Sequence, residues 1–135
     1  MIGYLIDGTM PIYYESGKKE GEITYKNGKP DGKFTFWYEN GQIWSEQSYN
    51  NGNFDGKHTA WYENGQLWYE QYFKNGKRVG HWLMWHNNGK KMSDVYWLND
   101  EYVVRKSWDM NGKLWLHIDV ENGIRLNLGI SKMKS

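Results

Sequence analysis

The sequence predicts an all-β fold, a single elongated and twisted antiparallel meander sheet of about five stacked β-hairpins. The chain repeats itself every 24 residues. Asn-Gly pairs recur between strand-like segments, which is the strongest short signal for a hairpin turn. No stretch keeps the apolar spacing of an amphipathic helix, because Gly or Asn interrupts the chain every ten or so residues. Glycines mark the repeat at Gly8, Gly32, Gly56 and Gly80, and again at Gly17, Gly41, Gly65 and Gly89.

The repeat divides one domain, residues 1–135, into five units. A length of 135 residues is usual for a single domain. The fifth unit has lost one residue relative to the others, and no repeat pattern continues after it. Repeat arrays need an atypical end unit as a cap, so we expect the fifth unit to be one. The expected boundaries are about 8–31, 32–55, 56–79, 80–103 and 104–126, with a C-terminal tail at 127–135.

The first turn of each unit sets the predicted register. If Asn40 and Gly41 form a two-residue type I′ loop, Trp37 faces Trp44 across the hairpin. The same rule pairs Trp61 with Trp68, Trp85 with Met92, Trp108 with Trp115 and, more weakly, Tyr13 with Glu20. Cross-strand aromatic pairs contribute about 0.2–1 kcal/mol each, so the three Trp–Trp pairs would stabilise their hairpins.

The second turn of each unit joins it to the next. These turns are expected at Asn27-Gly28, Asn51-Gly52, Asn75-Gly76 and the degraded pair Asn99-Asp100. The register then places Gly32 opposite Tyr49, Gly56 opposite Phe73 and Gly80 opposite Trp97. An aromatic ring can shield bare glycine backbone in this arrangement. The whole chain becomes a meander of about ten strands.

Strand alternation predicts which side chains share a face. One face would carry the tryptophans with Thr35, Thr59, Glu46 and Glu70. The opposite face would carry Phe34, Phe36, Tyr38, Ile43, Tyr49, Tyr62, Leu67, Tyr69 and Phe73. Stacked aromatics can simply cover a single-layer sheet, or they can form an exposed platform, since Trp and Tyr dominate binding hot spots. The candidate partner-binding residues are Trp37, Trp44, Trp61, Trp68, Trp85, Trp108 and Trp115.

Composition narrows the class of protein. Aromatic residues make up 18% of the chain and mean hydropathy is −0.93, which suits a thin sheet with two half-wet faces. A net charge of +1 argues against direct nucleic acid binding. Cysteine is absent, so there is no disulfide and no thiolate zinc site. The start lacks a signal-peptide core, and if Met1 is the native start we expect a cytoplasmic protein.

Candidate catalytic groups are weak. Glu22, Glu46, Glu70 and Asp94 recur at the repeat step, which would separate them by about 9.6 Å, two strand spacings. That distance is at or beyond the limit for glycosidase carboxylates, and similar surroundings would not split them into acid and base. The histidines, His58, His81, His86 and His117, lack metal-ligand spacing. We therefore expect no enzyme activity, no metal and no cofactor.

The recurring pattern W-Y-E-N-G-Q-x-W/Y-x-E-x-x-Y/F-x-N-G-K-x-x-G, clearest over residues 32–79, resembles the MORN repeat in its bacterial variant form. The resemblance covers about residues 8–123. It implies an elongated twisted sheet and a recognition role, because MORN arrays generally act as scaffolds for protein or membrane contacts. Some bacterial relatives carry an antitoxin-like label. The departures from the pattern lie at Asp100 and in the last unit.

These observations favour a non-enzymatic scaffold that binds another protein, of unknown identity, through an aromatic-rich sheet face. In a narrower form of this hypothesis, the protein neutralises a toxin or nuclease, as an antitoxin, immunity protein or inhibitor. The alternative is an aromatic-hairpin module for carbohydrate, choline-type cell-wall groups or membrane lipid, since aromatic cages bind quaternary ammonium. The basic residues of the tail, Arg125, Lys132 and Lys134, are too few for a membrane-binding cluster. Open edge strands leave a monomer and an edge-paired homodimer as oligomeric states.

Overall fold

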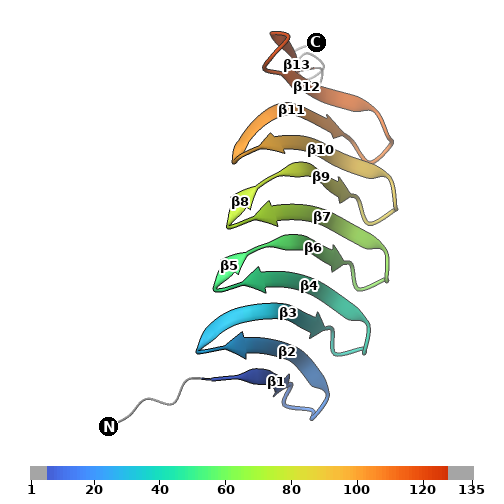
Figure 1. Ribbon diagram of the computed structural model, residues 1–135. Coiled ribbons are helices and arrows are strands. Elements are labelled where there is room, and N and C mark those ends of the chain that lie inside the picture. Colours follow the sequence, from blue (N-terminus) through green and yellow to red (C-terminus); the bar gives the residue numbers. More distant parts are fainter. Residues whose placement is uncertain (1–5, 128–135) are drawn as a thin grey trace.

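The computed structural model describes residues 6–127, which form one open, twisted antiparallel sheet without a helix (Figure 1). Successive hairpins stack along the long axis of the molecule from β1 at one end to β13 at the other. Every strand on the main path pairs with its neighbours in chain order, as a meander requires. The predicted all-β meander of stacked hairpins is therefore confirmed.

The sheet contains 13 strands, two of them only two residues long. The short strands β5 and β8 lead into β6 and β9, from which Asp55 and Val79 separate them. The strands are β1 (Gly8–Tyr13), β2 (Lys19–Lys26), β3 (Lys29–Trp37), β4 (Ile43–Asn50), β5 (Asn53–Phe54), β6 (Gly56–Trp61), β7 (Leu67–Lys74), β8 (Lys77–Arg78), β9 (Gly80–Trp85), β10 (Lys91–Leu98), β11 (Glu101–Trp108), β12 (Leu114–Asp119) and β13 (Ile124–Asn127). The predicted tail, apart from Asn127, lies outside the described residues, as do Lys132 and Lys134.

The turns that join successive hairpins have the predicted two-residue form. Asn51 and Gly52 both have positive φ, 50° and 88°, and Asn50 pairs directly with Asn53. Asn and Gly tolerate this left-handed backbone better than other residues, which is why the type I′ turn selects them. The same conformation occurs at Asn27-Gly28, Asn75-Gly76 and Asn99-Asp100.

The turns within each hairpin differ from the prediction. The amide of Gly41 donates to the carbonyl of Tyr38 (3.0 Å), and the amide of Tyr38 donates to the carbonyl of Gln42 (2.8 Å). Only Gly41, with φ of 89°, has left-handed backbone, whereas Asn40 does not. The loop therefore has three residues, a turn closed by a glycine in the left-handed conformation.

This longer loop creates a β-bulge beside it. Trp37 pairs with Ile43 and Phe36 pairs with Ser45, so Trp44 is an extra residue without a partner across the hairpin. The predicted Trp37–Trp44 pair is therefore wrong. The other predicted pairs fail in the same way, because Trp61 pairs with Leu67, Trp85 with Lys91, Trp108 with Leu114 and Tyr13 with Lys19.

Beyond the bulge the predicted register holds. Thr35 pairs with Glu46 and Gly32 pairs with Tyr49, and the pairs Gly56–Phe73 and Gly80–Trp97 are also present. Gly32 has φ of 101°, and a Cβ built there would lie 3.3 Å from the side chain of Thr24, not against an aromatic ring. The backbone conformation therefore accounts for this glycine better than shielding by Tyr49 does.

The core is a row of aromatic rings that runs along one face of the sheet. Neighbouring ring centroids lie 4.4 to 6.0 Å apart. No large side chain of the described residues is fully buried, and Phe34 and Ala60 are the only hydrophobic residues among them classed as buried. Stability therefore depends on rings shared between hairpins. The row consists of Tyr25, Phe34, Tyr49, Phe54, Phe73, Trp82, Trp97 and Tyr102.

Candidate interaction surface

The two faces of the sheet have different chemistry. We call the side that carries the aromatic row the ring face, and the other side the charged face. Ion pairs lie on the charged face, three of them across neighbouring strands and one, Lys19–Glu22, within β2, and the predicted carboxylates Glu22, Glu46, Glu70 and Asp94 supply them. The pairs are Lys19–Glu22, Lys33–Glu46 (3.7 Å), Lys57–Glu70 (3.3 Å) and His81–Asp94 (2.9 Å). Because Glu22, Glu46 and Glu70 each have a lysine partner, nothing separates an acid from a base among them, and Asp94 has the imidazole of His81 in place of a lysine.

The predicted tryptophan ladder is divided between these faces. Trp37 lies on the charged face, where the Nζ atom of Lys19 is 5.7 Å from its ring, and Lys91 lies 5.8 Å from Trp108 in the same way. Strand alternation from Thr59 and Leu83 places Trp61 and Trp85 on this face too.

The remaining tryptophans lie on the ring face. Trp44 contacts the rings of Phe36 and Tyr38, at 5.9 and 6.1 Å between centroids. Trp68 contacts Tyr62 and Tyr69 at 5.4 and 5.3 Å, and Trp115 lines a hollow on this face. The prediction of one shared face is wrong because the bulge adds one residue, and a shift of one residue reverses the face of a side chain.

The bulged positions of the second to fifth hairpins form a distinct apolar set, which we call the bulge row: Trp44, Trp68, Met92 and Trp115, whereas Glu20 is the bulged residue of the first hairpin. Each occupies the same place beside a three-residue loop in successive hairpins. Trp44 and Trp115 are 41% and 38% exposed. Trp68 and Met92 are half-buried, and a row of large apolar side chains that are exposed or half-buried is a candidate for contact with a partner.

Hydrogen bonds between hairpins, which the sequence analysis missed, hold the loops in register. The hydroxyl of Tyr38 donates to the carbonyl of Trp61 (2.7 Å), and that of Tyr62 donates to the carbonyl of Trp85 (2.6 Å). Tyr14 reaches Trp37 in the same way (2.6 Å). Burial raises the pKa of Tyr38 and Tyr62, so both phenols stay protonated donors near neutral pH. The repeated Trp-Tyr pair was the sequence signal.

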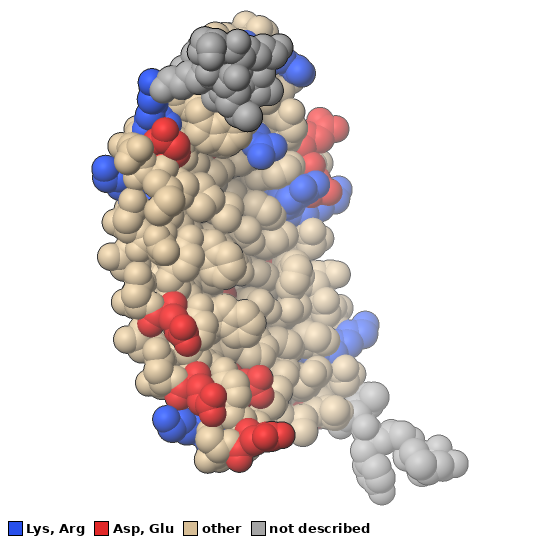
Figure 2. Space-filling view, turned by 180° about the vertical axis from the view of Figure 1, so that it is seen from behind, with Lys and Arg blue, Asp and Glu red and all other residues tan. Residues whose placement is uncertain are grey.

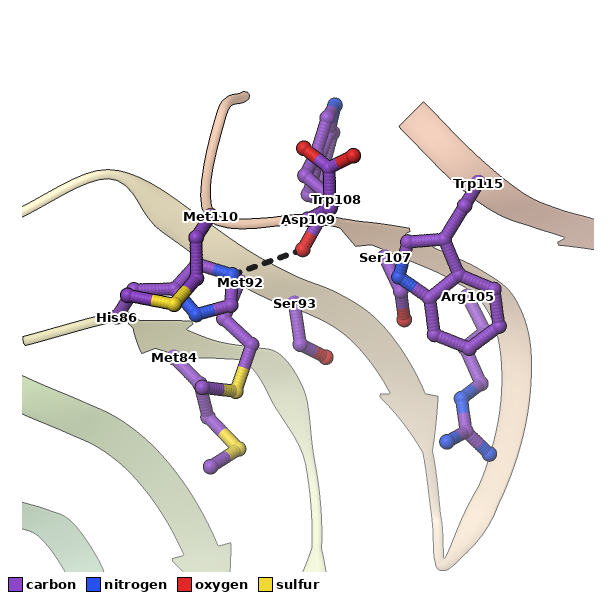
Figure 3. A pocket seen from close by; sticks show the side chains of 10 residues that line it. All are labelled: Met84, His86, Met92, Ser93, Arg105, Ser107, Trp108, Asp109, Met110 and Trp115. Atoms are coloured by element: carbon purple, nitrogen blue, oxygen red, sulfur yellow. Dashed lines mark hydrogen bonds between the residues drawn. The ribbon is translucent and has the colours of Figure 1, made fainter. Parts of the chain in front are cut away.

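His86 replaces the tyrosine in the fourth hairpin and keeps its hydrogen bond. Its Nε2 atom lies 2.9 Å from the carbonyl oxygen of Trp108 (Figure 3). A carbonyl only accepts, so this nitrogen carries the proton. The histidine therefore has a structural partner in the place where the other hairpins use a phenol.

A second set of contacts ties the two-residue turns together. The carboxylate of Asp31 accepts from the amide of Asn51 (3.3 Å), and Asp55 accepts from Asn75 (3.2 Å). In the fourth hairpin Val79 stands at the position of Asp55, and the contact is reversed. Asp100, in the turn itself, accepts from the Nε atom of Arg78 (2.6 Å). Hydrogen bonds from Arg78 lower the pKa of Asp100.

His58 belongs to the aromatic core. It is 4% exposed, packs against Tyr49, Phe54 and Phe73, and its Nε2 atom lies 3.0 Å from the carbonyl oxygen of Ser48. Burial lowers its pKa, because the charged form would lose solvation. Within residues 6–127, no three His, Cys, Asp or Glu side chains are grouped as a metal site.

A hollow of about 450 Å³ opens on the ring face between β9, β10, β11 and β12 (Figure 3). Its walls carry the thioethers of Met84, Met92 and Met110 and the indole of Trp115. The remaining lining residues are His86, Ser93, Arg105, Ser107, Trp108 and Asp109. The hollow is therefore mostly apolar, with polar groups at a few defined points.

Charged side chains are distributed unevenly over the surface. In Figure 2 the centre of the visible face is nearly free of charge, and most charged groups lie along its two long sides. This view is of the ring face, since the ion pairs of the charged face would appear in the centre. Glu15, Glu39 and Glu63 occupy the loops of the first three hairpins, whereas Asn87 and Met110 take their place later. The loop side is thus acidic only toward β1.

Comparison with known families finds a match over the first part of the chain. The MORN repeat variant matches residues 6–27, 30–51 and 54–75, which are three consecutive repeats at the 24-residue interval. No curated protein matches the chain. This part of the chain is thus built from MORN repeat variants, and the hairpins of β9 to β12 continue the same stack. MORN repeats are generally non-enzymatic and suggest a repeat scaffold for protein or membrane binding. Within residues 6–127, no helix has the length and apolar character to cross a membrane.

Proposed function

We propose that this chain is a non-enzymatic repeat scaffold that binds a partner protein through the ring face, with the bulge row as the main contact. The observation that carries the proposal is the bulge itself. In the second to fifth hairpins it takes one large apolar side chain out of cross-strand pairing and places it on a face whose centre is almost uncharged, whereas the bulge of the first hairpin carries Glu20. Trp and Met side chains that are exposed or half-buried in such surroundings are typical of protein interfaces.

The charged face supports the proposal less well. Its acidic groups Glu46 and Glu70 already pair with lysines and Asp94 with His81, and lysine side chains lie over Trp37 and Trp108. Of the seven tryptophans predicted to bind, we therefore propose only Trp44, Trp68 and Trp115. The other four, Trp37, Trp61, Trp85 and Trp108, contribute to the sheet.

Affinity capture tests the proposal. The purified chain is immobilised, exposed to an extract of the organism that encodes it, and the captured protein is identified and re-purified for a sizing column. A Trp44→Ser, Trp68→Ser variant should lose the complex, while a Lys33→Ser, Lys57→Ser variant, altered on the charged face only, should keep it. A chain that elutes alone, or a complex that survives the tryptophan changes, would refute a ring-face scaffold.

We also propose a narrower role, neutralisation of a toxin or nuclease in the cytoplasm, as a specific form of this binding. Its support is the resemblance to antitoxin-like relatives together with an absence of cysteine that suits a reducing compartment. Co-expression with the captured partner tests it. Growth should depend on intact Trp44 and Trp68 if the partner is toxic alone.

The exposure of Trp44 and Trp115 favours one alternative, a module for carbohydrate or choline-type groups. Titration of choline and glycan fragments against tryptophan fluorescence separates this alternative from protein binding. An unchanged spectrum at millimolar ligand would eliminate it. Co-sedimentation with liposomes tests membrane lipid in the same way.

A further inference from the structure

The ring face changes character in the fourth hairpin. In the third hairpin the loop tyrosine Tyr62 stacks on the bulge residue Trp68, with centroids 5.4 Å apart and planes at 26°. In the fourth hairpin the equivalent residues are His86 and Met92, and this ring pair is missing. The hollow of about 450 Å³ lies at this break in the repeat. It is therefore a local feature of this chain and not a property of every repeat.

The walls of the hollow suit an apolar side chain. Met84, Met92 and Met110 are unbranched and polarisable, so they adapt to the shape of an inserted group. Met110 is 51% exposed and Trp115 is 38% exposed, and both border the hollow. Figure 3 shows the sulfur atoms of Met84 and Met92 in the hollow, with Trp115 on the opposite side. An inserted side chain would remove this exposed apolar area from water.

Arg105 adds a charge at the edge of the hollow. It is exposed, and its partners across the neighbouring strands are the apolar residues Val95 and Ile118. No hydrogen bond or ion pair joins Arg105 to another residue in the part of the chain that the structure describes. A guanidinium beside an apolar site binds carboxylates well, because its N–H groups can donate in pairs.

The other charged group of the hollow is already engaged. The Oδ1 atom of Asp109 accepts hydrogen bonds from the backbone amides of Asn111 and Lys113, at 2.9 Å each. Its charge is therefore held by the loop. The hollow thus combines apolar walls with a cationic edge.

We propose that the hollow binds an apolar side chain of the partner protein that is followed or preceded closely by Asp or Glu, whose carboxylate pairs with Arg105. This inference rests on the proposed function and names the chemistry of the partner segment. Charge complementarity decides between partners, because a basic segment would place its charge against Arg105. An apolar segment without an acid would fill the hollow and contact its walls, but it would leave Arg105 unpaired.

A peptide selection tests the proposal with the full chain. A phage library of random peptides is panned against the immobilised protein, in the presence of soluble Met92→Trp variant as competitor. This variant restores the bulge residue found at Trp44 and Trp68, so it fills the hollow while following the repeat. The selected peptides should combine a Leu, Phe, Trp or Met with an acid at an adjacent or next-but-one position.

Affinities of one selected peptide then locate its contacts, with the fluorescence polarisation of a dye attached to the peptide as the signal. Arg105→Glu should weaken binding about fivefold or more, since it replaces an attractive exposed pair by a repulsive one. Met92→Trp should weaken it by about tenfold or more, as loss of a buried anchor does. Lys106→Glu is the matched control, because it makes the same charge change on the neighbouring residue of the same strand, whose side chain lies on the charged face. It should change the affinity by less than about twofold.

Selected peptides without acids, equal binding to Arg105→Glu, or no enrichment over the Met92→Trp competitor would each overturn the proposal. The scaffold function is judged separately. Peptides that lose binding in the Trp44→Ser, Trp68→Ser variant but not in Met92→Trp would place the contact elsewhere on the ring face. That result would refute the hollow and leave the proposed function standing.

Discussion

At the scale of single residues, the loop tyrosines connect one hairpin to the next. Tyr62 extends along the ring face, stacks on Trp68 and donates its hydroxyl proton to the carbonyl of Trp85 in the following hairpin. A single-layer sheet has little buried area to hold neighbouring hairpins together. A side chain that reaches across strands therefore contributes a larger share of the free energy of unfolding. The hydrogen bond also gives a partner to a carbonyl beside the loop.

Removal of this hydroxyl should lower the free energy of unfolding. Tyr62→Phe keeps the ring and its stacking but leaves the Trp85 carbonyl without its donor, which should cost about 0.5–1.5 kcal/mol. Denaturation in urea, followed by tryptophan fluorescence, measures the change. Tyr96→Phe is the control, since within residues 6–127 the Tyr96 hydroxyl makes no hydrogen bond. Equal effects of the two changes would contradict the proposed role of Tyr62.

The buried His58 should make stability depend on pH. Burial lowers its pKa in the folded protein below the ordinary value of 6.5. Between the lowered pKa and 6.5 the unfolded chain binds more protons than the folded protein, so the free energy of unfolding rises with pH. The contribution of His58 is therefore complete above pH 6.5 and is lost as the pH falls toward its folded pKa.

Urea denaturation of the wild type and of His58→Gln at several pH values isolates this contribution. The difference in the free energy of unfolding between the two proteins should be constant above pH 6.5 and should change as the pH falls below that value. His117→Gln is compared in the same way as a control. A pH dependence that His58→Gln leaves unaltered would show that other groups cause it.

At the scale of the elements, the sequence predicts one kind of turn correctly and the other incorrectly. Both contain Asn-Gly. At Asn51 and Gly52 both residues have positive φ, whereas at Asn40 and Gly41 only the glycine does. The dipeptide alone does not encode this difference, because the closing hydrogen bonds of the longer loop begin at Tyr38, before the pair. Strand existence and order were predictable from the repeat, and the loop type was not.

The same limit explains what was missed on the surface. Strand alternation assigns faces correctly until a bulge adds a residue, so Thr35 and Glu46 were placed together correctly while Trp44 was placed on the wrong face. The hollow beside Met92 was also not predicted, since it depends on side chains from four strands. The replacement of Tyr and Trp by His86 and Met92 was the signal in the sequence.

The three-residue loop predicts a specific cost for a change at its last residue. Gly41 has φ of 89° and nothing lies within 4 Å of a Cβ built there, so Gly41→Ala tests the backbone conformation without a steric clash. An alanine in this region should destabilise the protein by about 1–2 kcal/mol. Glu39→Ala, in the same loop but with ordinary backbone, should have little effect. Thermal unfolding monitored by circular dichroism measures both variants, and equal melting temperatures would contradict the loop conformation.

At the scale of the whole molecule, the sheet behaves as a one-dimensional array. Each strand on the main path pairs only with its neighbours, and the aromatic row and the loop tyrosines connect adjacent hairpins. Stability in such arrays is approximately a sum of terms for each repeat and each interface between neighbours. An internal repeat should therefore be removable if its neighbours can form an equivalent interface.

Deletion of residues 32–55 is the strongest test of this architecture. It joins Asp31 to Gly56, so Asp31 takes the place of Asp55 beside the turn at Asn75, and Tyr14 takes the place of Tyr38 opposite the carbonyl of Trp61. We expect a shorter sheet that still unfolds cooperatively, with a lower melting temperature because one repeat and one interface are lost.

Deletion of residues 32–43 is the control, because it removes only half a repeat and joins Asp31 to Trp44. The chain then loses one strand of an antiparallel pair, and β4 would have to run in the direction of β3. This control should fail to fold, as judged by circular dichroism and by rapid proteolysis. If the two deletions behave alike, contacts between adjacent repeats do not determine the fold, and the aromatic row does not hold the hairpins together.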